Sequence, residues 1–147
     1  MRRTRVALFV HLVWATWDRA PVLVGEVERR VHRAIEASCV EMGAEALAVG
    51  GVEDHIHLLA RLPATLTVAD LAQRVKGASA HLVTHVVAPD TFFKWQGGYA
   101  AFSISQGHLD VVRAYIAHQK EHHHNGSLIP EWEDATDAAA AIPPSPQ

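Results

Sequence analysis

The stretch Asp54-His55-Ile56-His57-Leu58-Leu59-Ala60-Arg61-Leu62 places two histidines two residues apart in a run that is typical of a β-strand. Successive side chains of a strand point to opposite faces of its sheet, so His55 and His57 share one face. The opposite face receives only apolar side chains, those of Ile56, Leu58, Ala60 and Leu62. The stretch therefore predicts a core on one face of the strand and, on the other, two imidazoles that could share a metal ion.

A second segment, residues 109–121, predicts a helix that carries a tyrosine beside its apolar stripe. The stripe consists of Leu109, Val112 and Ile116. Tyr115 lies about a quarter turn from the stripe, and Gln119 follows one turn later on the same side. A free tyrosine has a pKa of about 10, so its hydroxyl is a poor nucleophile unless a metal ion or a base lies beside it. Tyr115 is therefore either a nucleophile that works with the histidine pair or a ring packed at a helix-sheet boundary.

The rest of the chain alternates between strand and helix patterns. Alternating and apolar runs predict strands at 5–17, 44–51 and 55–62 and a strand or hairpin at 92–105, and helical spacing predicts helices at 26–42, 67–86 and 108–122. Thr67 is the expected N-cap of the second helix. This order favours an α+β fold of the ferredoxin-like, split βαβ type, in which helices pack against an antiparallel sheet.

Length and composition suit a single domain. The chain has 147 residues, of which 49% are hydrophobic, and we expect a domain at 1–124 followed by an acidic, Ala/Pro-rich flexible tail at 125–147. The single Cys39 cannot form an internal disulfide, which favours the cytoplasm. No apolar run approaches the roughly 18 residues of a membrane span.

Charge neither demands nor excludes a nucleic-acid partner. The net charge is −3, but acidic residues gather after residue 130, and residues 1–130 carry about +1. We expect salt-dependent contacts with DNA from basic side chains near the histidine strand and the late turn, and stacking of bases on rings there. The candidates are Arg61, Arg74, Lys76, Lys94 and Trp95, with Tyr99 as a second ring and Arg2, Arg3 and Arg5 as a basic arm.

Other histidines compete for a metal role. His81 and His85 lie one helical turn apart but lack a neighbouring glutamate of the zinc-protease kind, so a wet helix face is the expected environment. In the run 122–124, only His122 is expected on the side of Tyr115. Asp54 could orient a ligand imidazole, but alternation predicts that its side chain points away from His55, and we assign it no role.

Four stretches of the sequence resemble a known family. They are His11–Thr16 with Arg19–Leu23, Asp54–Leu59, Leu66–Ser79, and Gly98-Tyr99 with Val112–Gln119. In this order they are similar to the single-tyrosine HUH transposases of the smallest bacterial insertion sequences and to the REP-associated tyrosine transposases. The match spans roughly residues 5 to 124.

The resemblance implies an enzyme that nicks single-stranded DNA with hairpin structure and transfers the strand. It implies that His55, His57 and Gln119 bind Mg²⁺ or Mn²⁺, and that Tyr115 attacks a phosphodiester to give a 5′-phosphotyrosine and a free 3′ hydroxyl. It also implies a homodimer, in which one chain's tyrosine helix could complete the other's site. Two alternatives remain open at this stage, a DNA-binding module without catalysis and a small metal-binding protein unrelated to DNA.

Overall fold

The computed structural model describes residues 3–133 and contains a four-stranded antiparallel sheet with the strand order β2-β3-β1-β4. The elements are β1 (Leu8–Ala15), η1 (Trp17–Arg19), α1 (Gly25–Glu41), β2 (Glu45–Val52), β3 (His55–Leu62), α2 (Val68–Leu82), η2 (Val83–Val87), β4 (Ala100–Ile104), η3 (Gln106–His108), α3 (Leu109–Ala117), α4 (Gln119–Asn125) and α5 (Pro130–Glu133). The order of the main elements is the predicted one, and the α+β fold with a split βαβ arrangement is confirmed.

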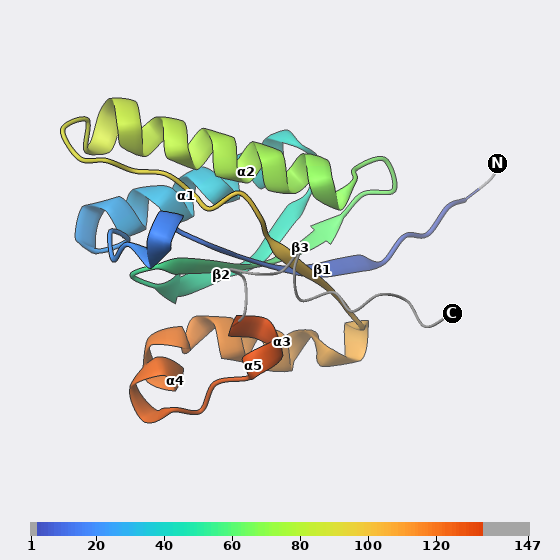
Figure 1. Cartoon of the computed structure of the whole chain (residues 1–147). Helices are drawn as coiled ribbons and strands as arrows, with labels where there is room; N and C mark the ends of the chain where they lie inside the picture. The colour runs from blue at the N-terminus through green and yellow to red at the C-terminus, as the bar shows by residue number, and fades with distance from the viewer. Residues whose placement is uncertain (1–2, 134–147) are drawn as a thin grey trace, which may run out of the picture.

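Helices cover both faces of the sheet. Helices α1 and α2 lie on one face, while α3, α4 and α5 lie on the other (Figure 1). The main core forms between the sheet and the first pair of helices, and it includes Ile56, Leu58, Ala60 and Leu62 of β3. A smaller cluster on the opposite face joins Leu59 to Val112 and Ile116 of α3. The predicted division of β3 into a core face and a histidine face is thus confirmed.

The histidine strand lies in the interior of the sheet. β3 pairs with β1 on one side and with β2 on the other, and His57 stands opposite both Val13 and Gly50. Both backbone edges of β3 are therefore held by hydrogen-bond ladders, which fix the direction of its side chains.

Several predicted elements are shorter in the structure. The strand predicted at 5–17 ends at Ala15, because Thr16 leaves the ladder and forms an isolated bridge with Trp95. The strand or hairpin predicted at 92–105 is a single strand, β4, preceded by the isolated bridge at Trp95. The helix predicted at 67–86 ends as a π-helical turn, η2. Its predicted N-cap is confirmed, since the Thr67 hydroxyl accepts a hydrogen bond from the Asp70 N–H at 3.1 Å.

The predicted helix 108–122 is two helices that meet at His118. This residue has φ −110° and ψ 28°, outside the helical range. Its ring Nδ1 donates to the Ala114 carbonyl at 2.8 Å, the carbonyl that its own backbone N–H also contacts at 3.1 Å. The bend starts a new helix at Gln119, whose side chain is buried beneath it.

A glycine lets α3 approach the sheet closely. A Cβ atom at Gly50 of β2 would lie 2.4 Å from the Ile116 carbonyl oxygen, so only glycine fits there. The C-terminal turn of α3 therefore rests directly on the β2 backbone. We expect this contact to set the height of the neighbouring Tyr115 above the sheet.

Within residues 3–133, no helix combines the length and the apolar character needed to cross a bilayer.

Candidate metal and tyrosine site

The histidine pair is fully buried on the face covered by α3 and α4. The ring centroids of His55 and His57 lie 5.0 Å apart. His55 Nδ1 lies 2.7 Å from Asp54 Oδ1. Because a carboxylate only accepts hydrogen bonds, this ring nitrogen carries a proton and Nε2 faces the site. Such a carboxylate partner is typical of histidines that bind metal ions.

The contact with Asp54 corrects our expectation for that residue. Strand alternation predicted that Asp54 points away from His55, but Asp54 lies in the tight turn between β2 and β3, where alternation does not apply. Arg19 Nε, 3.6 Å from Asp54 Oδ2, adds a positive charge to the same carboxyl group. Its hydrogen bond with His55 holds the pKa of Asp54 below its usual value, against the opposing effect of burial.

His57 has a second histidine as its partner. His11 Nε2 of β1 lies 2.9 Å from His57 Nδ1. Burial, reinforced by the neighbouring His57, lowers the pKa of His11 to about 3, so His11 is neutral. A neutral His11 can accept from His57 Nδ1–H, which leaves a free lone pair on His57 Nε2. His11 was not among the predicted site residues, because its approach to His57 depends on the pairing of β1 with β3.

The carboxylate of Glu133, at the end of α5, lies between the Nε2 atoms of His55 and His57. Its Oε1 lies 3.0 Å from His55 Nε2 and 2.8 Å from His123 Nε2, and its Oε2 lies 3.2 Å from His57 Nε2. Burial raises the pKa of Glu133, but the hydrogen bond from His55 and the nearby His57 and Tyr115 outweigh it and hold this pKa far below its usual value. We expected a flexible tail at 125–147. Ile129, Trp132 and Glu133 of this segment instead contact the site, while residues 134–147 lie outside the described residues.

Tyr115 faces the same carboxylate. Its hydroxyl donates to Glu133 Oε2 at 2.5 Å and accepts from the Ile129 N–H at 3.0 Å. Burial and the Glu133 carboxylate raise the pKa of Tyr115 to about 12. The ring is 5% exposed and stacks on His122, with centroids 4.7 Å apart. His122 therefore lies on the side of Tyr115, as predicted.

Gln119 completes the ring of polar side chains. Its Oε1 lies 3.4 Å from His55 Nε2 and 3.2 Å from His123 Nε2, and the residue is 1% exposed. An amide oxygen beside a ligand imidazole is a suitable third donor for a metal ion. The structure thus brings the predicted His55, His57, Gln119 and Tyr115 into one site and adds His11, Asp54, His123 and Glu133.

The donor set fits a divalent cation. Among residues 3–133, His55, His57 and Glu133 form the one group of metal-binding side chains whose ligand atoms all lie within 4.8 Å of one another. His57 Nε2 is buried and has no hydrogen-bond partner in suitable geometry. Buried polar atoms normally have one, and a metal ion bound here would supply it. Burial would lower the pKa of His55, but Asp54 and Glu133 raise it to about 9. A bound cation would displace this proton.

The predicted DNA contacts have different positions. Arg61 is exposed on the histidine face, four residues and about 13 Å along the strand from His57. The Nζ atom of Lys94 lies 4.4 Å from the Trp17 ring centroid. Lys76 is half-buried and donates to the carbonyls of Gln96 and Gly98, so it holds the late turn in place.

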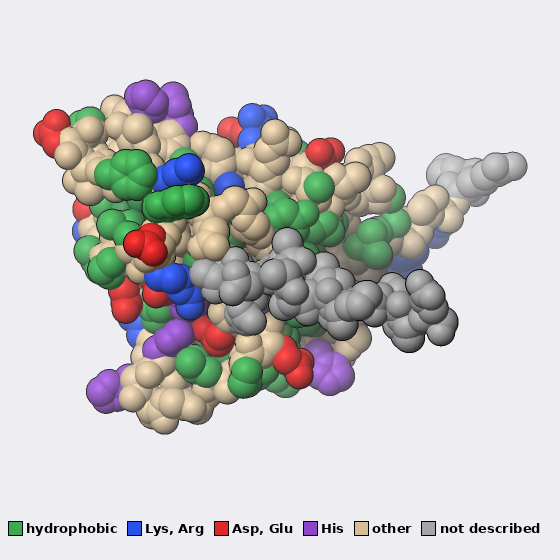
Figure 2. All heavy atoms as spheres, viewed as in Figure 1, with side chains coloured by type: hydrophobic (Ala, Val, Ile, Leu, Met, Phe, Trp, Pro, Cys, Tyr) green, Lys and Arg blue, Asp and Glu red, His purple; other side chains and the backbone are tan. Residues whose placement is uncertain are grey.

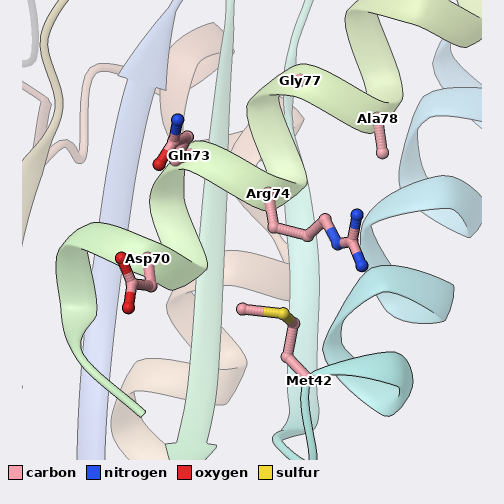
Figure 3. A pocket seen from close by; sticks show the side chains of 6 residues that line it. All are labelled: Met42, Asp70, Gln73, Arg74, Gly77 and Ala78. Atoms are coloured by element: carbon pink, nitrogen blue, oxygen red, sulfur yellow. The ribbon is translucent and has the colours of Figure 1, made fainter.

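Arg74 and Trp95 lie on the other side of the sheet from the site. Arg74 points with Met42 into a hollow between α2 and the end of α1 (Figure 3), where it lies 3.7 Å from Glu41. Trp95 is a core residue, 6% exposed, whose Nε1–H donates to Ser79 Oγ at 3.0 Å. The predicted stacking of a DNA base on Trp95 is therefore wrong, because both faces of its ring are covered by the core.

The remaining charges and histidines form no second centre in the described part of the chain. His81 and His85 are exposed, with ring centroids 4.3 Å apart and no acidic partner among residues 3–133. In the view of Figure 2, the basic side chains that are not hidden by grey atoms are scattered among acidic ones.

Comparisons with known proteins identify the family of the chain. Residues 4–119 match the family model described as IS200-like transposase. The chain is 27% identical over 117 residues to the ISDra2 transposase TnpA of Deinococcus radiodurans, covering 76% of this chain and 83% of that protein. It is 26% identical over 135 residues to the transposase of insertion sequence element IS200 from Salmonella typhimurium, covering 88% of each.

Two solved structures of transposases resemble this chain. A candidate transposase from Deinococcus radiodurans superposes with a TM-score of 0.62 at 28% identity, covering 81% of this chain and 98% of that one. A REP-associated tyrosine transposase bound to a REP hairpin shares the fold, with a TM-score of 0.64 at 17% identity over 98% of this chain and 87% of its own.

Fold, site and relatives together define a transposase. Because the family model spans most of its length, the chain belongs to the IS200-like transposase family.

Proposed function

We propose that this transposase nicks and rejoins single-stranded DNA through a covalent bond to Tyr115. The Tyr115 oxygen attacks a phosphodiester phosphorus, and the bond from phosphorus to the 3′ oxygen breaks. Tyr115 loses its proton, and the released 3′ oxygen gains one. The resulting 5′-phosphotyrosine keeps the energy of the phosphodiester, so a second DNA end can reverse the step without ATP.

One observation carries this proposal. The Tyr115 hydroxyl and both ligand imidazoles contact a single carboxylate, that of Glu133, at distances between 2.5 and 3.2 Å. The attacking oxygen and a metal ion held by the histidines would therefore reach the same phosphate group. Positioning of this kind is, together with electrostatic stabilisation, the main contribution that a protein makes to a displacement at phosphorus.

We propose His55, His57 and Gln119 as the ligands of this ion, and Mg²⁺ or Mn²⁺ as its identity. A divalent ion bound there would draw charge from the phosphorus through a phosphate oxygen. Asp54 and His11 hold the two imidazoles with their Nε2 atoms toward it. Mn²⁺ is the better experimental choice because it accepts imidazole nitrogen more readily than Mg²⁺ does.

We infer that the DNA substrate is a single strand with hairpin structure, as in the complex of the REP-associated relative. Arg61 and Lys94, both exposed, are the basic side chains that we propose for its phosphates. Binding should weaken steeply with salt. We also propose a homodimer, which light scattering on the purified protein would detect, and a cytoplasmic location, where Cys39 stays reduced.

The test uses 3′-labelled single strands with hairpins, Mn²⁺, and the denatured protein as the readout. The chain has two tyrosines, so Tyr99→Phe is a matched control for Tyr115→Phe. We expect the label to remain with the unaltered protein and with Tyr99→Phe, and to be absent from Tyr115→Phe. An adduct that survives in Tyr115→Phe would exclude this mechanism. Absence of any adduct, despite measured metal and DNA binding, would favour a DNA-binding module without catalysis.

A further inference from the structure

The proposed reaction leaves one part of the site without a role, the segment that brings Glu133 there. We call residues 126–133 the C-terminal strap. It begins at Gly126, whose left-handed φ of 73° turns the chain back after α4, and ends with α5. The Trp132 ring anchors it, packing edge-on against Tyr115 at 5.0 Å and against His11 at 5.1 Å between centroids.

We propose that Glu133 is a ligand of the metal ion in the DNA-free protein, and that the scissile phosphate takes its place when DNA binds. The second half of this statement rests on the proposed function. The first half concerns the metal site alone and can be tested without DNA.

The ligand role follows from the position of the carboxylate. Each of its oxygens approaches one of the two histidine Nε2 atoms, at 3.0 Å for His55 and 3.2 Å for His57. The Glu133 side chain is only 11% exposed, so water does not compete with it for this place. A buried carboxylate needs a cationic partner, and Mg²⁺ and Mn²⁺ prefer oxygen donors. Glu131, on the same short helix, is exposed and has no such contact.

The exchange follows from what the strap does to Tyr115. The hydroxyl donates to Glu133 and accepts from the Ile129 N–H, so both of its hydrogen bonds go to the strap. A phosphate that is attacked by this hydroxyl and bound to the metal ion must occupy the space that the Glu133 carboxylate fills. Two anions repel each other at such a distance. Productive DNA binding therefore requires Glu133 to leave.

The first measurement is calorimetric titration of Mn²⁺ into the DNA-free protein. Removal of a side chain that hydrogen-bonds a metal ligand typically costs about 10–100-fold in affinity, so loss of a ligand itself should cost at least about tenfold. We expect that loss in Glu133→Gln, which keeps the size of the side chain, and unchanged affinity in Glu131→Gln, which removes the same charge nearby. Glu133→Asp keeps the charge but withdraws the carboxylate, and it should also bind Mn²⁺ more weakly.

The second measurement is the affinity for a hairpin-bearing single strand in saturating Mn²⁺, with Tyr115→Phe as the background so that no covalent step occurs. The further substitution Glu133→Gln should tighten binding by about tenfold, because the phosphate no longer has to displace a negatively charged ligand from the metal ion. Glu131→Gln in the same background should leave the DNA affinity unchanged.

Equal Mn²⁺ affinities in all variants would overturn the ligand role, and unchanged DNA affinity on removal of Glu133 would overturn the exchange. Neither readout requires a phosphotyrosine. If Tyr115 were not the nucleophile, the adduct experiment would fail. The Mn²⁺ and DNA affinities would still show whether Glu133 is a ligand and whether DNA displaces it.

Discussion

Replacement of Gly50 by alanine tests whether the contact between β2 and α3 positions the tyrosine. The new Cβ atom would lie 2.4 Å from the Ile116 carbonyl oxygen, whereas ordinary contacts begin at 3.4 Å. The obstacle is backbone, so no side chain can rotate away. The end of α3 must therefore move by about 1 Å, and Tyr115, the residue before Ile116, must move with it.

This displacement has two expected costs. Overpacking of a close contact costs about 1–3 kcal/mol in the free energy of unfolding. A shift of about 1 Å in a reacting group can cost about 100-fold in rate. We therefore expect Gly50→Ala to form the covalent DNA adduct about 100-fold more slowly than the unaltered protein at saturating DNA, while it remains folded at room temperature.

Single-turnover adduct formation and urea denaturation provide the two measurements. Gly107→Ala is the matched control, because Gly107 lies just before α3 and a Cβ atom there meets nothing within 4 Å. If Gly50→Ala formed the adduct at the rate of Gly107→Ala and unfolded at the same urea concentration, the contact would not set the position of Tyr115.

Two further predictions concern the partners of the histidines. Asp54→Asn should lower Mn²⁺ affinity by about 10–100-fold in calorimetric titration, because the carboxylate no longer fixes His55; the exposed Asp90→Asn is the control, and equal affinities would contradict the orienting role. The His11 pKa of about 3 lies below its ordinary value of 6.5, so the unfolded chain binds the proton first as the pH falls. This contribution to the stability of the metal-free protein is thus present above pH 6.5 and is lost as the pH falls toward 3. Urea unfolding at a series of pH values should show this fall, with a shallower slope in His11→Gln; identical slopes would count against it.

The sequence predicted those parts of the site that follow from local periodicity. Alternation along residues 55–62 was sufficient to place both histidines on one face, and helical spacing was sufficient to put Tyr115 and Gln119 together. Even there the pattern missed the bend at His118, which depends on a hydrogen bond from the His118 side chain to Ala114. The spacing of apolar residues does not show whether a side chain will hydrogen-bond a backbone carbonyl and so end a helix.

The parts that sequence analysis missed depend on contacts between distant segments. His11 and His57 are 46 residues apart, and their contact requires the antiparallel pairing of β1 with β3. Trp95 lies between Lys94 and the Gly97-Gly98 turn, where we expected an exposed ring. The ring is instead buried in the main core. Glu133 lies in a segment whose composition resembles a tail, but it gains a cationic environment from residues far away in the chain. One signal was available, an isolated Trp132 next to Glu133.

The strand order β2-β3-β1-β4 divides the site between two cooperative units. His55, His57 and His11 belong to the two inner strands, which can open only when the sheet itself opens. Tyr115, Gln119 and Glu133 belong to a layer that meets the sheet through the small cluster around Leu59. Amide hydrogen exchange should therefore proceed at very different rates in the two halves. Exchange that is faster in α3, α4 and α5 than in β1 and β3 would show that the layer carrying Tyr115 can open while the strands that hold the imidazoles stay closed.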